Sequence, residues 1–177
     1  AVRVICRRSQ LMQRLSGLGA VAQLDADPAE IQPLIADYAA HLAIASRNGP
    51  RSTVLSGEHD AMEACLARLQ AAGVFFRRVR VDVASHSPQM ELLRDDLLRS
   101  LEGVRSVQPQ VAMYSTVNGR QVQEAMLDAA YWYRNLREPV LLWPTVELLR
   151  ELGYTDDEVD ALAAEGAVLD APVERPA

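Results

Sequence analysis

A strand followed by a capped helix, with a histidine at the corner between them, constrains this sequence more than any other feature. The run 79–83 alternates β-branched with polar residues, which is typical of a strand. Ser87-Pro88 pairs a capping residue with proline at the first helical position. Apolar residues then recur at helical spacing: Met90, Leu93, Leu97, Leu101 and Val104. His86 lies at this corner, where α/β folds collect ligands and catalytic groups, and is either an ordinary loop histidine or a catalytic base.

The chain before this corner alternates short strands and helices. Strands are predicted over 19–25, 42–45, 52–56 and 74–83, and helices over 27–38 and 58–72. The order β-α-β-β-α-β is that of a split, ferredoxin-like unit. This fold serves many unrelated roles, so it names no function.

The first residues have the pattern of an amphipathic helix. Val4, Leu11 and Leu15 share one face, and Arg8 falls on the same stripe, whereas Arg7 points to solvent. A guanidinium on an inward face needs an anion, because burying it unpaired is costly. Arg8 is therefore either a structural ion pair or snorkelling side chain, or a clamp for a carboxylate.

The chain after the corner continues as a mixture of both element types. The pattern predicts a helix over 87–103, a strand over 110–117 that ends at the turn Asn118-Gly119, and helices over 127–136 and 141–152. The aromatic trio Tyr131-Trp132-Tyr133 is interpreted as core packing. Residues 173–177 are expected to fray.

Composition excludes several classes of protein. An apolar share of 49% and a charged share of 24% are ordinary for a soluble globular chain of 177 residues. The net charge of −6 argues against nucleic acid or an anionic membrane as the main partner. Cys6 and Cys65 have no metal-ligand spacing, so no metal is expected, and no membrane span or signal peptide is visible. A cytoplasmic location is therefore predicted.

Four phrases, in this order, are similar to those of a known family. They are 48–57 (NGPRSTVLSG), 81–88 (VDVASHSP), 114–119 (YSTVNG) and 131–140 (YWYRNLREPV). They resemble the acyltransferase domains of modular type I polyketide synthases, relatives of malonyl-CoA:acyl-carrier-protein transacylase, and the match runs from residue 1 to about residue 153. The resemblance implies an α/β-hydrolase-like large subdomain, here 1–17 and 84–153, with a ferredoxin-like small subdomain inserted, here 18–83.

The resemblance also implies a reaction and roles for single residues. Such domains transfer an extender acyl group from CoA to the phosphopantetheine thiol of an acyl carrier protein, with no bound cofactor, beside neighbouring synthase domains. His86 resembles the family's base and Asn135 the residue whose carbonyl orients it. Arg8 resembles the arginine that pairs with the extender's free carboxylate. Val83, Ala84 and Ser85 occupy the phrase associated with extender choice, and Ser85 in place of Phe predicts a branched, methylmalonyl-like extender.

The sequence departs from the family at both ends. The family's nucleophile lies in a Gly-x-Ser-x-Gly elbow, and the 177 residues contain no such motif. The nucleophilic serine is therefore expected upstream of Ala1, and the chain alone is expected to be inactive. Residues 154–177 depart as well, and are predicted to form a divergent, acidic helical tail that is somewhat like the C-terminal helix of class III CoA-transferases.

Two hypotheses remain open at this point. In the first, the chain is part of a polyketide synthase acyltransferase. In the second, it is a non-catalytic ferredoxin-like module that binds a carrier protein or a small acyl ligand. The absence of a Gly-x-Ser-x-Gly elbow favours the binding module for the isolated chain. The presence of His86, Asn135 and Arg8 favours a polyketide synthase acyltransferase as the protein from which the chain derives.

Overall fold

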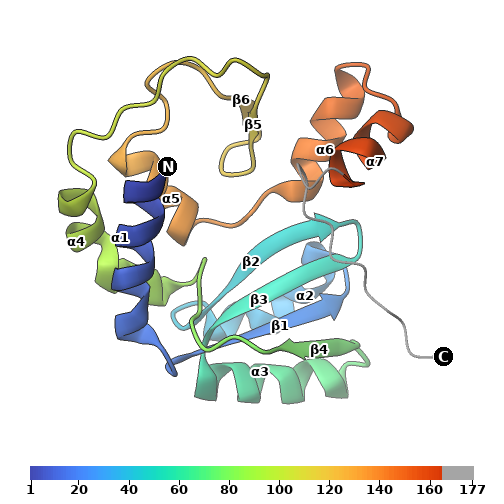
Figure 1. The fold of residues 1–177 in the computed structure, drawn as a ribbon. Coiled ribbons are helices and arrows are strands. Elements are labelled where there is room, and N and C mark those ends of the chain that lie inside the picture. The colour runs from blue at the N-terminus through green and yellow to red at the C-terminus, as the bar shows by residue number, and fades with distance from the viewer. Residues whose placement is uncertain (165–177) are drawn as a thin grey trace.

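A computed structural model describes residues 1–164 as a four-stranded sheet with helices on one face and a separate helical group beside it (Figure 1). The elements, in chain order, are α1 (Val2–Met12), η1 (Gln13–Leu15), β1 (Gly19–Asp25), α2 (Pro28–Ile35), η2 (Ala36–Tyr38), β2 (Leu42–Gly49), β3 (Ser52–Glu58), α3 (His59–Ala71), β4 (Phe76–Val79), η3 (Pro88–Leu93), α4 (Arg94–Ser100), β5 (Tyr114–Ser115), β6 (Arg120–Gln121), α5 (Ala129–Arg137), α6 (Leu142–Glu151) and α7 (Asp156–Ala164).

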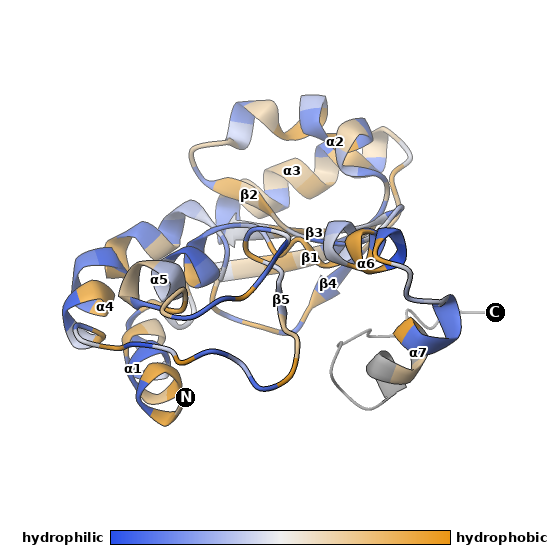
Figure 2. Cartoon of the chain, turned by 90° about the horizontal axis from the view of Figure 1, so that it is seen from above, coloured by the Kyte–Doolittle hydropathy of each residue, from blue (hydrophilic) through white to orange (hydrophobic). Residues whose placement is uncertain are grey.

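The larger sheet has the strand order β2-β3-β1-β4, and each neighbouring pair is antiparallel. Because side chains alternate along a strand, Ala22, Leu24 and Leu55 share one face, and that face is buried. Helices α2 and α3 cover this face (Figure 2). Asp27 caps α2 by accepting a hydrogen bond from the Ala29 amide at 2.7 Å. The predicted β-α-β-β-α-β order is present.

A second core joins α1, η3, α4 and α5 into a helical group. The predicted inward face is confirmed over α1 and η1, since Val4, Leu11 and Leu15 are buried. Their buried partners are Met90, Leu93, Leu97, Leu101 and Leu136. Arg8, on the same stripe, is half-buried. This group therefore holds two candidate site residues, Arg8 on α1 and Asn135 on α5.

The last strand of the sheet is shorter than predicted. The pattern predicted a strand over 74–83, but β4 ends at Val79. Beyond it, the Asp82 carbonyl accepts hydrogen bonds from the amides of Gly17 and Gly19, at 3.0 and 3.1 Å. These bonds turn the chain out of the sheet before Val83. The corner that carries His86 is therefore a loop fixed by contacts with the start of β1.

The helix predicted over 87–103 begins as a 3₁₀ helix. Ser87 caps it, because its side chain accepts from the Gln89 amide at 3.3 Å, and its carbonyl accepts from the Met90 amide at 3.1 Å. With three residues per turn, Met90 and Leu93 lie on the same side, and both are buried. The α-helical part, α4, begins only at Arg94.

The strand predicted over 110–117 was wrong except at its end. Only β5 pairs, with β6, around the predicted Asn118-Gly119 turn, where Gly119 has φ +61°. Val111 and Met113 are exposed, and although the Met113 carbonyl accepts from the Val122 amide at 2.7 Å, the described strand begins only at Tyr114. An alternating pattern forms a strand only where a neighbouring strand is available to pair with it.

The segment after α5 returns to the sheet. The Val140 amide donates to the Ala45 carbonyl at 2.8 Å, and the Arg47 amide donates to the Val140 carbonyl at 3.0 Å. Ser46 and Val140 thereby form a parallel bridge at the edge of β2. Helix α6 then follows as predicted, and α7 covers the start of the predicted acidic tail. Residues 165–177, including the end expected to fray, lie outside the described part.

No helix among the described residues is long and apolar enough to cross a bilayer.

Candidate active site

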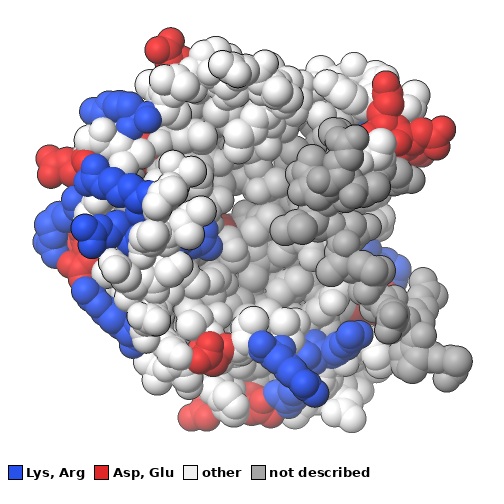
Figure 3. All heavy atoms as spheres, in the orientation of Figure 1, with Lys and Arg blue, Asp and Glu red and all other residues white. Residues whose placement is uncertain are grey.

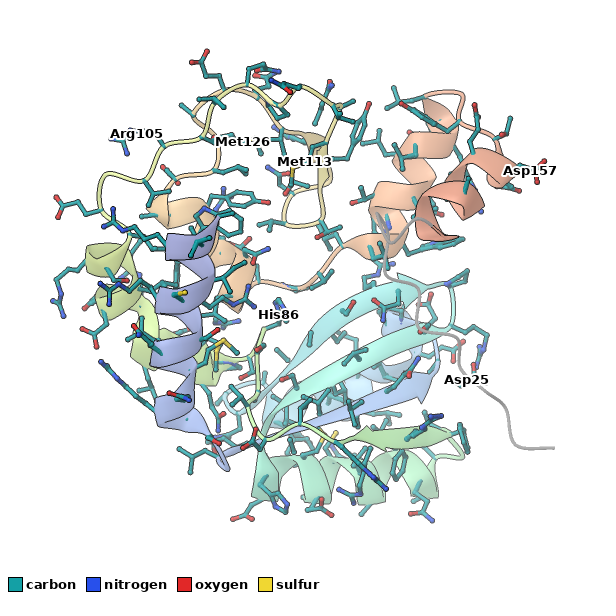
Figure 4. The ribbon with its side chains drawn as sticks, in the orientation of Figure 1. Asp25, His86, Arg105, Met113, Met126 and Asp157 are labelled. Carbon is teal, nitrogen blue, oxygen red and sulfur yellow. The ribbon has the colours of Figure 1, made fainter. Side chains whose placement is uncertain are left out.

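His86 lies at the junction between the helical group and the sheet (Figure 4). Its backbone has φ +62°, an uncommon conformation for a residue with a side chain. Two contacts support it: the His86 amide donates to the Leu136 carbonyl at 2.9 Å, and the ring Nδ1 lies 2.8 Å from the Glu138 carbonyl oxygen. The end of α5 therefore fixes both the backbone and the ring of this histidine.

The contact with Glu138 determines which ring nitrogen carries the proton. A carbonyl oxygen only accepts hydrogen bonds, so Nδ1 is the protonated nitrogen. In the neutral ring, Nε2 then holds the free lone pair. Burial lowers the pKa of His86, the Glu138 carbonyl opposes this by raising it, and the charge of Arg8 lowers it further. His86 is therefore neutral at pH 7, as a general base must be.

Arg8 and Arg7, which are neighbours in α1, have different surroundings. The Arg7 side chain is exposed and donates to Gln10 at 3.2 Å. Arg8 is half-buried, and its Nη1 donates to the Oδ1 atom of Asn135 at 2.9 Å. No carboxylate lies within ion-pair distance of Arg8 among the residues that the structure describes. Burial without a counterion lowers the pKa of Arg8 from its usual value.

The expected pairing of Asn135 with His86 is corrected by these contacts. Asn135 does lie at the site, but its side-chain oxygen contacts Arg8, whereas Leu136 and Glu138 contact the histidine. Sequence reasoning missed these two residues because they act through backbone carbonyls, which every residue type has. Pro139 was the available signal: it ends α5 and leaves the carbonyls of its last turn without helical partners.

The three residues before the histidine form a tight turn. Ala84 is completely buried, and a Cβ atom built on Gly19 would lie 2.2 Å from the Ala84 nitrogen. The Ser85 amide donates to the Val83 carbonyl at 3.1 Å, and the Ser87 hydroxyl donates to the Ala84 carbonyl at 2.7 Å. Val83 packs against the helical core, and Ser85 is half-buried next to His86.

A separate hollow between α1 and α4 contains none of the predicted site residues. It has a volume of about 390 Å³ and is lined by Arg7, Gln10, Leu11, Arg14, Asp96, Arg99 and Ser100. Cationic side chains gather on this side of the molecule (Figure 3). Arg14 of η1 pairs with Asp96 of α4, and Arg99 pairs with Asp96 within α4, so this cluster joins η1 to α4.

Within residues 1–164, no group of three or more histidine, cysteine, aspartate or glutamate side chains is placed to hold a metal ion. The described site instead combines a neutral imidazole, Nε2 of which is free to accept a proton, with a guanidinium that has no counterion. Successive residues of α5 hold the two groups, because the Asn135 side chain accepts from Arg8 and the Leu136 carbonyl accepts from the His86 amide. Such a pair suits a reaction that removes a proton from a nucleophile beside an anionic substrate.

Comparisons with known proteins identify the family of this chain. Residues 1–157 match the family described as acyl transferase domain. The chain is 45% identical over 153 residues to the spectinabilin polyketide synthase system protein NorA' of Streptomyces orinoci, which covers 86% of this chain and 4% of that protein. It is 40% identical over 155 residues to the erythronolide synthase EryA3 of Saccharopolyspora erythraea, which covers 87% of this chain and 5% of that protein.

A solved structure shows the same relationship. The acyltransferase domain from module 8 of the salinomycin polyketide synthase superposes with a TM-score of 0.82 at 37% identity, over 85% of this chain and 36% of that one. The chain thus spans a small part of its curated relatives and about a third of the solved chain. With the match over residues 1–157, these similarities show that the chain belongs to the acyltransferase domains of modular polyketide synthases.

Proposed function

We propose that this chain is the part of a polyketide synthase acyltransferase that supplies the base and the carboxylate-binding arginine. The reaction is transfer of an extender acyl group from CoA to the phosphopantetheine thiol of an acyl carrier protein. One observation carries the proposal: successive residues of α5 hold both groups, since the Asn135 side chain accepts from Arg8 and the Leu136 carbonyl accepts from the His86 amide, while Arg8 has no carboxylate partner among the described residues.

In the first half-reaction, His86 Nε2 takes the proton of a serine hydroxyl. The serine oxygen attacks the thioester carbonyl, the carbon–sulfur bond breaks, and the CoA thiolate leaves with the proton from His86. In the second half-reaction, Nε2 takes the proton of the phosphopantetheine thiol. The thiolate attacks the carbonyl carbon of the serine ester, the ester carbon–oxygen bond breaks, and His86 returns the proton to the serine oxygen. The serine belongs to a Gly-x-Ser-x-Gly segment, which these 177 residues do not contain.

Arg8 selects the acyl group by binding its free carboxylate. A guanidinium matches a carboxylate with two parallel hydrogen bonds, and burial strengthens the pair. Ser85 and Val83 face the α-carbon of the bound group and leave space for a methyl substituent, with Ala84 packed behind them. The preferred extender is therefore methylmalonyl.

The two cores correspond to two subdomains. Residues 18–83 form the ferredoxin-like small subdomain, which the sheet order β2-β3-β1-β4 supports, and residues 1–17 and 84–153 belong to the large one. The site lies where the loop leaving the sheet meets α1 and α5.

The test joins this chain behind the upstream half of a relative's acyltransferase that contains Gly-x-Ser-x-Gly; we call the product the reconstituted acyltransferase. With radiolabelled methylmalonyl-CoA and a carrier protein, we expect label on the enzyme and then on the carrier. The 177-residue chain alone serves as the control and should retain no covalent label. A reconstituted enzyme that binds carrier protein but never becomes labelled would favour the non-catalytic binding module instead.

A further inference from the structure

The partner of Arg8 is unusual among the arginines of this chain. Eight other arginines form ion pairs with a carboxylate, and all of them except Arg137 are exposed: Arg14, Arg51, Arg68, Arg78, Arg94, Arg99, Arg137 and Arg150. Arg8 is the one whose pKa is lowered by burial, yet its described partner is the neutral amide of Asn135. The residue that most needs a counterion therefore has a partner without charge.

The chemistry of the two groups fixes how they meet. A guanidinium only donates hydrogen bonds, so Asn135 must present its carbonyl oxygen to Arg8. The bond joins Nη1 to Oδ1 at 2.9 Å and links α1 to α5, between residues 127 positions apart in the sequence. With Nη1 held, the guanidinium plane is oriented and its remaining N–H groups can serve a second acceptor.

An aspartate would be the stabilising choice if Arg8 were purely structural. Replacing the amide by a carboxylate adds a charge-assisted pair of the kind that satisfies a buried guanidinium. A carboxylate at position 135 would also neutralise the positive charge that a carboxylate ligand needs. An amide of the same shape holds the group in place and leaves its net charge available.

We propose that Asn135 is a positioning residue for Arg8: it orients the guanidinium without neutralising it and so keeps an open site for the carboxylate of the acyl group. This inference rests on the proposed function, because it concerns the carboxylate site of that reaction. It assigns Asn135 to substrate selection, whereas the adjacent carbonyls of Leu136 and Glu138 orient His86.

The experiment measures equilibrium binding of two CoA esters, methylmalonyl-CoA and propionyl-CoA, to the full chain by calorimetry. The esters differ by one carboxylate, so any contact with the CoA portion cancels in the ratio of their dissociation constants. We expect the unsubstituted chain to prefer methylmalonyl-CoA by at least about tenfold, the range of a partly desolvated charge pair. Asn135→Ala should reduce this preference, and Asn135→Asp should abolish it.

Comparing the loss of preference in Asn135→Ala with that in Asn135→Asp distinguishes a positioning role from a packing role. A packing role predicts that the isosteric Asp is milder than Ala, whereas a positioning role predicts the reverse. Asn118→Asp is the matched control, because it adds the same charge in the turn between β5 and β6, where Asn118 accepts from the Arg120 amide at 3.2 Å. It should leave the preference unchanged. Circular dichroism confirms that each variant is folded.

Each result decides between the two proposals. If the unsubstituted chain prefers methylmalonyl-CoA and Asn135→Asp keeps that preference, the inference is wrong and the proposed function stands. If the unsubstituted chain binds both esters equally, or neither, the carboxylate site itself is wrong and the inference falls with it. Loss of the preference in Asn118→Asp would also overturn the inference, because the effect would then be one of overall charge.

Discussion

The ring Nδ1 of His86 lies 2.8 Å from the backbone carbonyl oxygen of Glu138, 52 residues further along the chain. The main chain, not an acidic side chain, therefore sets the tautomer of the proposed base. Glu138 precedes Pro139, which restricts it to an extended conformation, and its ψ of 158° agrees with this. The carbonyl is thereby aimed out of the helix and toward the histidine.

The side chain of Glu138 should be dispensable. In the reconstituted acyltransferase, we expect Glu138→Ala to keep acyl transfer within about twofold, because the substitution leaves the carbonyl in place. Removing the base with His86→Ala should lower the rate by about 10² to 10⁴, the usual contribution of general acid–base catalysis. Steady-state rates of transfer to the carrier protein test both. A large loss in Glu138→Ala would mean that its carboxylate, not its carbonyl, supports the histidine.

Burial of the neutral imidazole should make folding stability depend on pH. The pKa of His86 is lowered in the folded chain, whereas an unfolded histidine titrates near pH 6.5. Below about pH 6.5 the unfolded chain therefore binds the additional proton, and the free energy of unfolding falls as pH falls toward the lowered value. Urea titrations between pH 5 and 8 should show this slope, and His86→Asn, which tolerates the positive φ, should flatten it. An unchanged slope in the variant would contradict the shift.

The neighbouring arginines of α1 should differ in their effect on substrate choice. In the reconstituted acyltransferase, Arg8→Ala should lower kcat/KM for methylmalonyl-CoA at least about tenfold more than for propionyl-CoA, because only the first has a carboxylate for the guanidinium. Arg7→Ala is the matched control and should leave the ratio unchanged, since the one side-chain hydrogen bond of Arg7 among the described residues is to Gln10. Equal losses for both esters in Arg8→Ala would show a structural role.

The residue before the histidine should control the size of the extender. Ser85→Phe fills the space proposed for the α-methyl group and should shift the competition between methylmalonyl-CoA and malonyl-CoA toward malonyl. One methyl group in a pocket is worth about 1 to 3 kcal/mol, so a change in preference and not absolute exclusion is expected. An equimolar competition assay on the reconstituted acyltransferase measures the ratio. A starting enzyme that already prefers malonyl-CoA would contradict the proposal.

The close approach of Gly19 to the site loop should be essential for stability. A Cβ atom at Gly19 would lie 2.2 Å from the Ala84 backbone nitrogen, so Gly19→Ala forces the backbone to move and should destabilise the fold by about 3 kcal/mol or more. At Gly49 the nearest atom would be 3.6 Å away, an ordinary contact, so Gly49→Ala should change stability little. Urea denaturation compares the two; similar losses would show that the site loop accommodates the extra atom.

The sequence predicted what depends on side-chain pattern and missed what depends on backbone geometry. Helical periodicity predicted the inward stripe of α1, the core of α2 and α3, and the position of Arg8. In the structure, packing against the sheet and the neighbouring helices buries these apolar faces. The end of β4 could not be predicted, because two glycine amides that bond Asp82 decide it. The same holds for His86, whose partners are carbonyls from α5.

Asn135 shows a different limit. The family phrase brought this residue to the site, but its side-chain partner depends on which helices pack together. The contact with Arg8 requires α1 and α5 to meet through the buried cluster around Leu136. No pattern within either helix specifies that packing, so the sequence could not predict which side chain Asn135 contacts.

The bridge between Ser46 and Val140 also bears on solubility. A sheet exposes unpaired backbone groups along its outer strands, and these can recruit strands from other chains. Here Val140 occupies part of the β2 edge, and irregular register interrupts the pairing of β2 with β3. At the opposite edge β4 is only four residues long and carries Arg77 and Arg78. Both edges of the sheet are thus protected against strand addition and aggregation.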